Sequence, residues 1–253
     1  MGRVHSGESV LARGVRIVEA FGLDDSVLSV SDIARRSGLH VATASRLIEE
    51  LVSCGWLERE GRRVRVGVRL WEVACRASPT VGLREAAMPF LEDLHAVVGH
   101  DAQLGVLEGD EVLFVERLSA PGVVVNYSRI AGRLPLHASS SGLVLLAHAP
   151  AERQEQVMRG PMTIYTERTI RTERDLRSTL AEVRRQGFAF CAGHIYPETT
   201  GIAAPVRDAN DRVVAAVALI VPNDDHARSL VPVLQAAGRG ISRVMASEGH
   251  PAG

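Results

Sequence analysis

The sequence predicts an α+β protein with two structural parts, and three observations support this fold class. Three short helical patterns lie within residues 11–53, and a strand, a glycine turn and a second strand follow within residues 56–66. Strand-like segments between residues 102 and 221 outnumber the helices between them, which indicates an antiparallel or mixed sheet. Residues 78–80, Ser-Pro-Thr, interrupt the helical pattern between the two sets, so we place the boundary there.

The composition is that of an ordinary globular protein. The 253 residues carry a formal net charge of −1, with 46% hydrophobic and 23% charged residues, which excludes collagen-like and extensively disordered chains. No apolar run approaches the roughly 20 residues of a membrane helix, and the N-terminal residues lack the apolar core of a secretory signal. Three scattered cysteines suit a reducing compartment, so we expect a cytoplasmic protein.

Each N-terminal helix has its own start or stop signal. The first is expected to end at Gly22 and to bury one apolar face, formed by Leu11, Val15, Val18 and Phe21. Ser31 precedes an acidic first turn and is the expected N-cap of a second helix that stops at Gly38. The third helix spans residues 41–53, and its expected buried residues are Ala44, Leu47, Ile48 and Leu51.

A small β-hairpin is expected after the third helix, at residues 56–66. Arg62, Arg63 and Arg65 project from its turn and second strand, where a DNA phosphate strand or minor groove would pass. Glu58 and Glu60 leave an alternative open, an ion network within the hairpin. Three helices and a basic wing together are typical of a winged helix–turn–helix. A further helix is expected over residues 68–77.

The third helix also has an outer face suited to a major groove. Its outward residues are small or form hydrogen bonds, which permits close approach to base edges. Arg46 is expected to contact a guanine or a phosphate, and the helix N-terminus at His40 favours phosphate. The alternative is an ordinary solvated helix face. The predicted DNA-binding residues are Ser31, His40, Ala42, Thr43, Ser45, Arg46, Arg62, Arg63 and Arg65.

The second part is expected to alternate between helices and strands. Helices are expected at residues 83–98, 143–148, 173–186 and 227–245, and strands at residues 102–107, 112–117, 123–127, 188–192, 202–207 and 213–221. Thr172 caps the helix at residues 173–186, and Gly187 ends it.

Short motifs along nearly the whole chain occur in the order of a known family. They are LSVSDIA (28–34), SRLI (45–48), GWL (55–57), VGVRL (66–70), LREAA (83–87), GDEV (109–112), GRLPLHA (132–138) and AAPVRD (203–208). Through them the sequence resembles the IclR family of bacterial transcriptional regulators. The resemblance implies a winged helix–turn–helix over residues 1–67, a linker helix over 68–80 and a GAF-like effector-binding domain over 81–253. Val41 and Ala42 replace the family's usual basic and hydroxyl pair, so Arg46 and the wing are expected to supply more of the phosphate contact.

The resemblance also implies a small-molecule pocket in the second domain. Ser139, Ser140 and Ser141 precede an expected helix, where hydroxyls and backbone N–H groups suit an anionic head group; the alternative is a serine-rich cap. Further pocket positions implied by the family are Val123, Asn126, Cys191, Gly201, Ala218 and Ile220, and we include His194 among the effector-binding candidates. Because this lining is mostly apolar or small, we expect an aromatic acid or its derivative.

An enzyme or metal-binding sensor is the competing class. Cys191, His194 and Glu198 resemble a nucleophile, a base and an orienting group, and His137 is a further possible zinc ligand. However, Cys191 ends an apolar strand, and the sequence contains no GxSxG, HExxH or phosphate-binding glycine motif. We therefore expect no enzymatic activity, no metal and no cofactor.

The sequence thus predicts a ligand-responsive transcriptional regulator. Its expected partners are a double-stranded palindromic operator, a small-molecule effector and further copies of itself, in a homodimer or homotetramer, without a membrane. Repression is the commoner mode in the family that the chain resembles.

Overall fold

The computed structural model describes residues 8–23, 25–77, 80–119 and 129–247. The chain divides into two compact units, Met1–Val81 and Gly82–Gly253. Each unit has its own hydrophobic core. In the described residues, no helix is both long enough and apolar enough to span a membrane.

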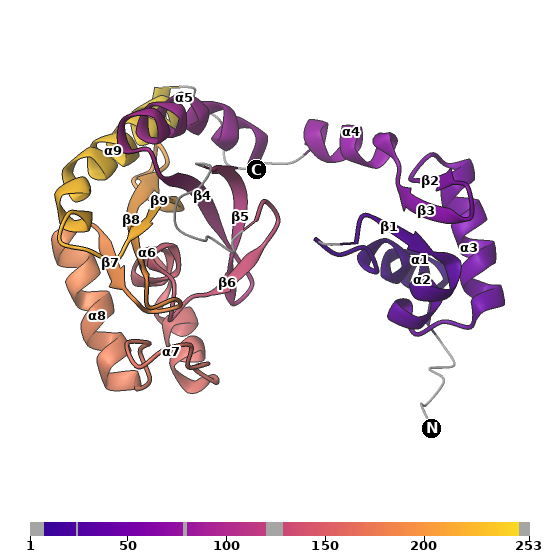
Figure 1. The fold of residues 1–253 in the computed structure, drawn as a ribbon, viewed down its shortest axis with the longest axis horizontal. Coiled ribbons are helices and arrows are strands. Elements are labelled where there is room, and N and C mark those ends of the chain that lie inside the picture. Colours follow the sequence, from indigo (N-terminus) through magenta and orange to yellow (C-terminus); the bar gives the residue numbers. More distant parts are fainter. Residues whose placement is uncertain (1–7, 24, 78–79, 120–128, 248–253) are drawn as a thin grey trace. The chain divides into compact units, whose positions relative to one another are not determined.

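The N-terminal unit contains three helices, a small sheet and a fourth helix (Figure 1). The helices are α1 (Val10–Glu19), α2 (Val30–Ser37), α3 (Val41–Ser53) and α4 (Val68–Ala77). The antiparallel sheet has the order β1-β3-β2, formed by Val27–Ser29, Arg63–Val66 and Leu57–Glu60. The bounds predicted for α3 and α4 are confirmed, and so is the hairpin of β2 and β3. Strand β1 escaped prediction because three residues are too few for an alternating pattern.

The predicted N-cap of α2 is wrong by two residues. Ser29 caps the helix, since its Oγ accepts a hydrogen bond from the Asp32 N–H at 3.1 Å. Its hydroxyl in turn donates to the Asp32 carboxylate at 2.7 Å. Ser29 also ends β1, where it pairs with Arg63, and this pairing holds it in the extended conformation that a cap requires. Ser31 therefore lies inside the first turn, with its side chain exposed.

The apolar face of the first helix differs in part from the prediction, although Phe21, just after α1, packs against the core as expected. Ile17 and Ala20 enter the core, whereas Leu11 is 78% exposed and Val15 is exposed as well. The core formed with α2, α3 and the sheet contains Ile33, Ile48, Leu57 and Val64.

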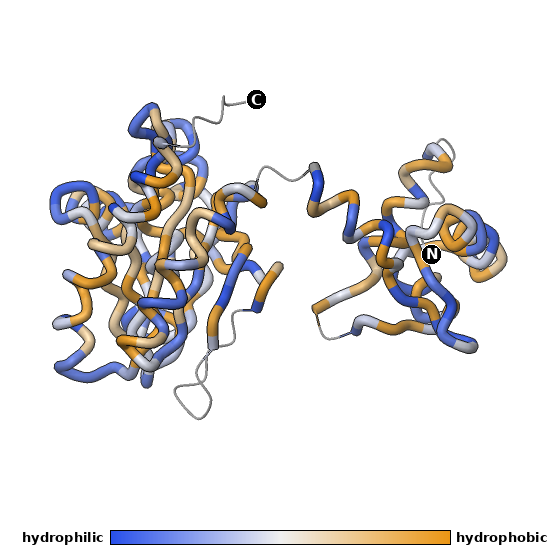
Figure 2. Tube along the Cα trace, turned by 90° about the horizontal axis from the view of Figure 1, so that it is seen from above, coloured by the Kyte–Doolittle hydropathy of each residue, from blue (hydrophilic) through white to orange (hydrophobic). Residues whose placement is uncertain are grey.

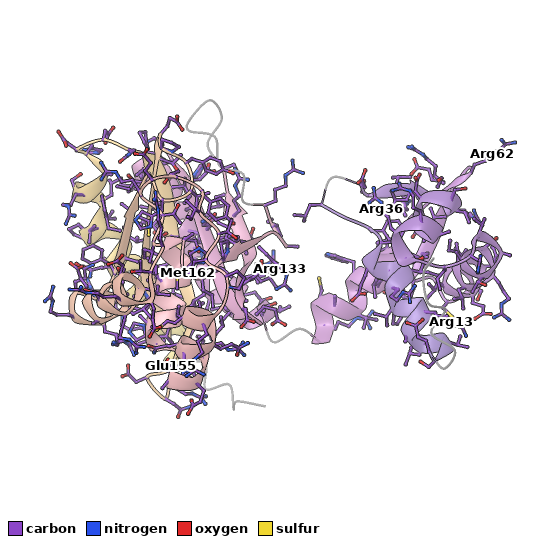
Figure 3. All side chains as sticks on the ribbon, turned by 90° about the horizontal axis from the view of Figure 1, so that it is seen from below. Arg13, Arg36, Arg62, Arg133, Glu155 and Met162 are labelled. Atoms are coloured by element: carbon purple, nitrogen blue, oxygen red, sulfur yellow. The ribbon has the colours of Figure 1, made fainter. Side chains whose placement is uncertain are left out.

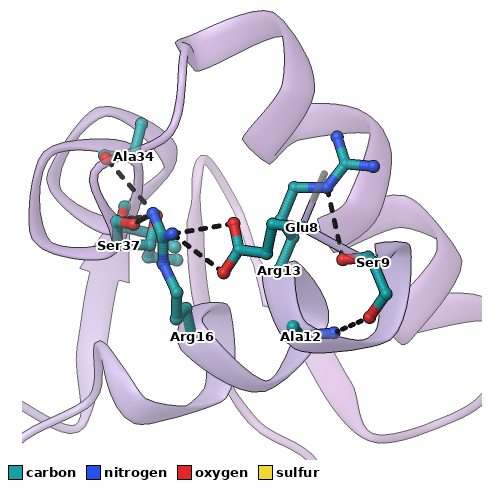
Figure 4. A network of polar contacts seen from close by, with 8 residues as sticks. Glu8, Ser9, Ala12, Arg13, Arg16, Ala34 and Ser37 are labelled. Carbon is teal, nitrogen blue, oxygen red and sulfur yellow. Dashed lines mark hydrogen bonds and ion pairs between the residues drawn. The ribbon is translucent and has the colours of Figure 1, made fainter. Parts of the chain in front are cut away.

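A polar network fixes the position of α1 (Figure 4). The Arg16 guanidinium donates to both carboxylate oxygens of Glu8 and to the carbonyl of Ser37 at the end of α2. The Ser37 hydroxyl donates a hydrogen bond to the carbonyl of Ile33, at 2.6 Å. The Arg16 guanidinium thus connects α1 to the end of α2. This contact fixes the orientation of α1 relative to α2 and α3.

The C-terminal unit is built on a six-stranded antiparallel sheet, as the sequence predicts (Figure 1). Its order is β6-β5-β4-β9-β8-β7, formed by Arg133–Pro135, Glu111–Leu118, Asp101–Glu108, Val213–Pro222, Thr199–Arg207 and Ala189–Ala192. The helices are α5 (Thr80–Val98), α6 (Ser140–His148), α7 (Ala151–Arg159), α8 (Glu173–Gln186) and α9 (Val231–Ser247), with a 3-10 turn at Ala227–Leu230. Helix α7 and strand β6 were not predicted. The strand predicted at residues 123–127 lies outside the described residues.

Two apolar layers enclose this sheet. Helices α5 and α9 cover one face through residues such as Leu91, Leu234 and Ile241. Helices α6 and α8 cover the other face through residues such as Leu146 and Leu176. In Figure 2 the hydrophilic segments of this unit lie mostly around its outside.

Small residues let α6 approach the sheet closely. The sheet face beneath it carries Gly201 and Ala203 from β8 and Ala216 and Ala218 from β9. Every residue from Ser140 to Ala147 is buried. A Cβ on Gly142 would lie 2.6 Å from the carbonyl oxygen of Leu136, so only glycine fits at that turn. The N-terminus of α6 is consequently held inside the domain.

Two glycines of the N-terminal unit provide a test of backbone packing. A Cβ on Gly67 would lie 2.3 Å from the carbonyl oxygen of Gly55, whereas a Cβ on Gly14 in α1 would have no neighbour within 4 Å. We expect Gly67→Ala to lower the free energy of unfolding by about 1–3 kcal/mol, because the backbone must move apart. The control Gly14→Ala should raise it by about 0.4–1 kcal/mol. Urea denaturation measures both, and equal stabilities would contradict the close crossing at Gly67.

Candidate nucleic-acid interface and effector pocket

Helix α3 presents its predicted outer face to solvent. Ala44, Leu47 and Ile48 are buried in the core. On the other side, Ala42 and Arg46 are exposed, and Thr43 and Ser45 are half-buried. His40 occupies the N-cap position but makes no side-chain cap bond, which leaves its ring exposed beside the first N–H groups of the helix. The helix therefore offers short side chains and one long cation outward.

The structure separates the arginines of this unit into paired and unpaired groups. Arg35, Arg36, Arg59 and Arg76 each form an ion pair, with Asp32, Asp25, Glu49 and Glu72 respectively. Among the described residues, the guanidinium groups of Arg46, Arg62, Arg63 and Arg69 have no hydrogen-bond or ion-pair partner. Three of these four were predicted to contact DNA. Arg69, at the start of α4, was not singled out from the sequence.

The wing arginines differ from one another. Arg62 lies in the turn and extends away from the hairpin (Figure 3). Arg63 and Arg65 lie two residues apart in β3, on either side of the buried Val64. Both Nε and Nη2 of Arg65 donate to one Glu58 oxygen, at 3.0 and 2.8 Å. The Val68 N–H and then Arg65 hold the pKa of Glu58 below its ordinary value, so this carboxylate stays charged. The alternative of an ion network thus applies to Arg65 only.

In the C-terminal unit, the three predicted serines have separate roles. Ser139 is the N-cap of α6: its Oγ accepts from the Gly142 N–H at 3.1 Å, and its hydroxyl donates to the Pro135 carbonyl at 3.0 Å. Ser140 lies against the sheet, because a Cβ on Gly201 would be 2.9 Å from its Oγ. Ser141 is 1% exposed, and its Oγ has no hydrogen-bond partner. The first turn of the helix therefore contains a buried hydroxyl, that of Ser141, without a hydrogen-bond partner in the protein.

The other predicted pocket residues lie on the sheet face beside this helix. Cys191 pairs in register with Gly201, and Gly201 pairs with Ile220, so the three residues form one row across β7, β8 and β9. Ala218 lies two residues from Ile220 on the same face. Val123 and Asn126 lie outside the described residues. The four described residues of the predicted set, Cys191, Gly201, Ala218 and Ile220, are apolar or small.

His194 is held close to the strand hairpin that carries Cys191. His194 lies in the turn between β7 and β8. The Thr166 hydroxyl donates to the Gly193 carbonyl of this turn, and the Thr169 hydroxyl donates to the His194 carbonyl, each at 2.6 Å. Burial, and then the nearby Arg168, hold the pKa of His194 below its ordinary value, which keeps the ring neutral near pH 7. Its Nδ1 is buried without a hydrogen-bond partner.

Two charged residues of this sheet face were missed from the sequence. Asp101 of β4 pairs in register with Ile220, and its carboxylate accepts a hydrogen bond from Arg117 of β5 at 2.8 Å. The neighbouring Gln103 is also buried. The sequence could have indicated them, because Asp101 and Gln103 occupy core-facing positions of a strand. A charged or amide side chain that is buried at such a position requires a polar partner.

The chemistry of Cys191 argues against a nucleophile. Burial raises the pKa of its thiol to about 12, so thiolate is rare at neutral pH. Nε2 of His137 donates to the Thr163 carbonyl at 3.0 Å, and Glu198 is exposed. Within the described ranges, no group of three His, Cys, Asp or Glu side chains is placed to hold a metal ion.

Comparisons with known proteins agree with this architecture. Residues 10–61 match the family model "IclR helix-turn-helix domain", and residues 75–243 match "Bacterial transcriptional regulator IclR C-terminal". The transcriptional regulator XynR of Escherichia coli is 29% identical over 247 residues, which cover 95% of this chain and 97% of XynR. The Pca regulon regulatory protein of Pseudomonas putida is 25% identical over 238 residues, 91% of this chain and 82% of that protein. These relatives are named regulators, which confirms that the protein is not an enzyme.

A solved structure is similar along nearly the whole chain. It is an IclR homologue from Microbacterium hydrocarbonoxydans in complex with 4-hydroxybenzoate, with a TM-score of 0.92 and 42% sequence identity. The match covers 94% of this chain and 100% of the other.

The burial of Cys191 predicts a graded reactivity of the thiols. With a pKa of about 12, the fraction of Cys191 present as thiolate at pH 8 is about one in ten thousand. We expect iodoacetamide to alkylate the exposed Cys54 first, and Cys191 only after unfolding in urea. Peptide mass spectrometry at timed intervals measures this order. Alkylation of Cys191 as fast as Cys54 in the folded protein would contradict the buried thiol.

Proposed function

The chain belongs to the IclR family of bacterial transcriptional regulators, and from this premise we propose that it is a cytoplasmic repressor controlled by an aromatic acid. In this proposal a homo-oligomer binds a palindromic operator through α3 and the wing, and a GAF-like C-terminal domain binds the effector. The observation that carries the proposal is the set of unpartnered groups: Arg46, Arg62 and Arg63 in one unit, and the buried Ser141 hydroxyl in the other.

The DNA contacts divide into reading and positioning. Thr43, Ser45 and Arg46 lie outward on α3, where they are suited to base edges in a major groove. Arg62 and Arg63 are suited to phosphates beside it, because their guanidinium groups need not first leave a carboxylate. In a two-fold symmetric assembly, two copies of α3 would enter successive major grooves about 34 Å apart.

The effector is proposed to bind at the N-terminus of α6. Its carboxylate would accept hydrogen bonds from the Ser141 hydroxyl and from the first N–H groups of the helix, whose dipole favours negative charge. Its ring would lie on the apolar row of Cys191, Gly201 and Ile220. The 4-hydroxybenzoate in the Microbacterium homologue supports this class of ligand. A coupling of about 1–3 kcal/mol between effector and operator would suffice for regulation.

The wing proposal predicts a specific salt dependence. We expect the double variant Arg62→Ala/Arg63→Ala to bind its operator more weakly and to lower the slope of log K against log salt by about two, because each phosphate contact contributes about 0.9. Fluorescence anisotropy with DNA from upstream of the gene, over a series of salt concentrations, measures the slope.

Arg65→Ala is the matched control for this experiment, since the Arg65 guanidinium is already bound to Glu58. In Arg65→Ala, the slope of log K against log salt should change by less than in a variant that lacks Arg62 or Arg63. In the same assay, Arg46→Ala should reduce the affinity for the operator more than the affinity for random DNA if Arg46 contacts a base. A slope unaffected by the double variant would refute the role of the wing.

The effector proposal predicts that Ser141→Ala separates ligand binding from stability. Loss of a hydrogen bond to a carboxylate should weaken 4-hydroxybenzoate binding about 10-fold or more, as calorimetry measures. The free energy of unfolding should not fall, because the hydroxyl has no partner in the protein. The control Ser139→Ala removes the N-cap and should lower it by about 1 kcal/mol. Unchanged ligand affinity in Ser141→Ala would contradict the assignment.

A further inference from the structure

A second concave site lies on the opposite side of the C-terminal sheet from α6. A cavity of about 450 Å³ opens between β8, α9 and the end of α8, a size suited to a small ligand. Arg207 of β8 and Arg239 and Arg243 of α9 all line it. The remaining lining includes Gly187, Ala204 and Pro205, which leave room between these cations.

Little negative charge balances this cluster. Arg239 and Arg243 are exposed one helical turn apart, and neither has an ion-pair partner among the described residues. Helix α9 contains no acidic residue from Val231 to Ser247. Arg207 donates to the backbone carbonyl of Asp211 at 2.8 Å, while the carboxylate of Asp211 is 3.6 Å away and largely exposed. Like charges placed four residues apart on a helix repel, so the arrangement costs stability unless an anion joins it.

The walls of the cavity are held in place. The Ser242 hydroxyl donates to the Gly238 carbonyl and accepts from the Arg207 N–H, at 2.7 and 2.9 Å, which ties α9 to the end of β8. A Cβ on Gly238 would lie 3.0 Å from the Pro205 carbonyl, so the helix runs close to the strand. Gln235 donates to the carbonyl of Gln186 at 3.1 Å and fixes the other end. The arginines are therefore displayed from rigid elements.

One of the three arginines, Arg207, also acts on a nearby histidine. His148, at the end of α6, is half-buried, and burial is the main cause that lowers its pKa. The guanidinium groups of Arg207 and Arg184 lower it further, against the opposing effect of its hydrogen bond to Val144 and of Asp211.

We propose that this cavity binds a small, multiply charged oxyanion, separately from the effector at α6. The forked geometry of a guanidinium matches phosphate and carboxylate oxygens in pairs, and three arginines suit at least two anionic groups. The apolar surface of Ala204 and Pro205 would accept the carbon skeleton of a phosphorylated metabolite or a tricarboxylate. The two parts of the domain would then recognise two chemically different ligands.

Calorimetry on the full-length protein tests this site, with inorganic pyrophosphate and citrate as separate probes at about 150 mM salt. We expect saturable binding of one anion per chain, weakened at least 10-fold in Arg239→Gln/Arg243→Gln. The control Arg159→Gln/Arg174→Gln makes the same change in charge at exposed positions on α7 and α8 and should bind like the parent protein. Tighter binding of pyrophosphate or of citrate assigns the phosphate or the carboxylate class, and either supports the site.

Other readouts separate this proposal from the effector site. The double variant should remain folded, with an unchanged or higher Tm, since a repulsive pair is removed, and it should bind 4-hydroxybenzoate as before. Absent or unsaturable binding of both anions, or equal weakening in both double variants, would overturn the proposal. A fall in operator affinity as large as the fall in anion affinity would also overturn it, because the arginines would then belong to the DNA contact.

Discussion

Competition for guanidinium groups is the constraint on which the binding surfaces of this protein depend. The chain contains 29 arginines and no lysine, and many of the arginines are already engaged by carboxylates of the same chain. A guanidinium bound in this way must give up a partner before it can bind a phosphate. Functional charge is therefore decided by pairing, and not by the arginine count. In the wing, this distinguishes Arg62 and Arg63 from Arg65, although all three are exposed.

The second constraint is the close packing of α6 on small residues. Gly201, Ala203 and Ala218 remove side-chain volume from the sheet, which lets the helix sink until all its residues from Ser140 to Ala147 are buried. Its N-terminal N–H groups then meet the sheet face in an environment of low dielectric, where a dipole acts strongly. The same sheet face contains Asp101 and Arg117, whose mutual ion pair satisfies two charges within the domain. Polar groups are thus placed around an otherwise apolar surface.

The sequence predicts well where local periodicity dominates. The bounds of α3 follow from its apolar spacing, and the hairpin follows from alternation around Gly61, because both patterns are contained within a few residues. Prediction fails where distant residues decide. Ser29 rather than Ser31 caps α2 because β1 pairs with β3, and Leu11 is exposed because α1 packs through Ile17. The cavity at α9 likewise depends on tertiary contacts. The pairing of Arg65 with Glu58 is local to the hairpin, and the sequence left it open as an alternative without deciding which arginine pairs. The serines were located from sequence, but only the structure distinguishes the cap Ser139 from the unpartnered Ser141.

These features share one energetic logic. A buried hydroxyl without a partner costs roughly 1–3 kcal/mol, and two adjacent arginines on a helix repel each other. An arrangement that satisfied Ser141 internally, or that placed a glutamate between Arg239 and Arg243, would stabilise the free protein. It would also remove the free-energy difference that a ligand can exploit, since binding strength comes from groups that are poorly satisfied before the ligand arrives. The unpartnered Ser141 hydroxyl and the repelling pair Arg239 and Arg243 are therefore the groups that a ligand would stabilise most. At these two places, ligand binding can shift the populations of the protein's conformations.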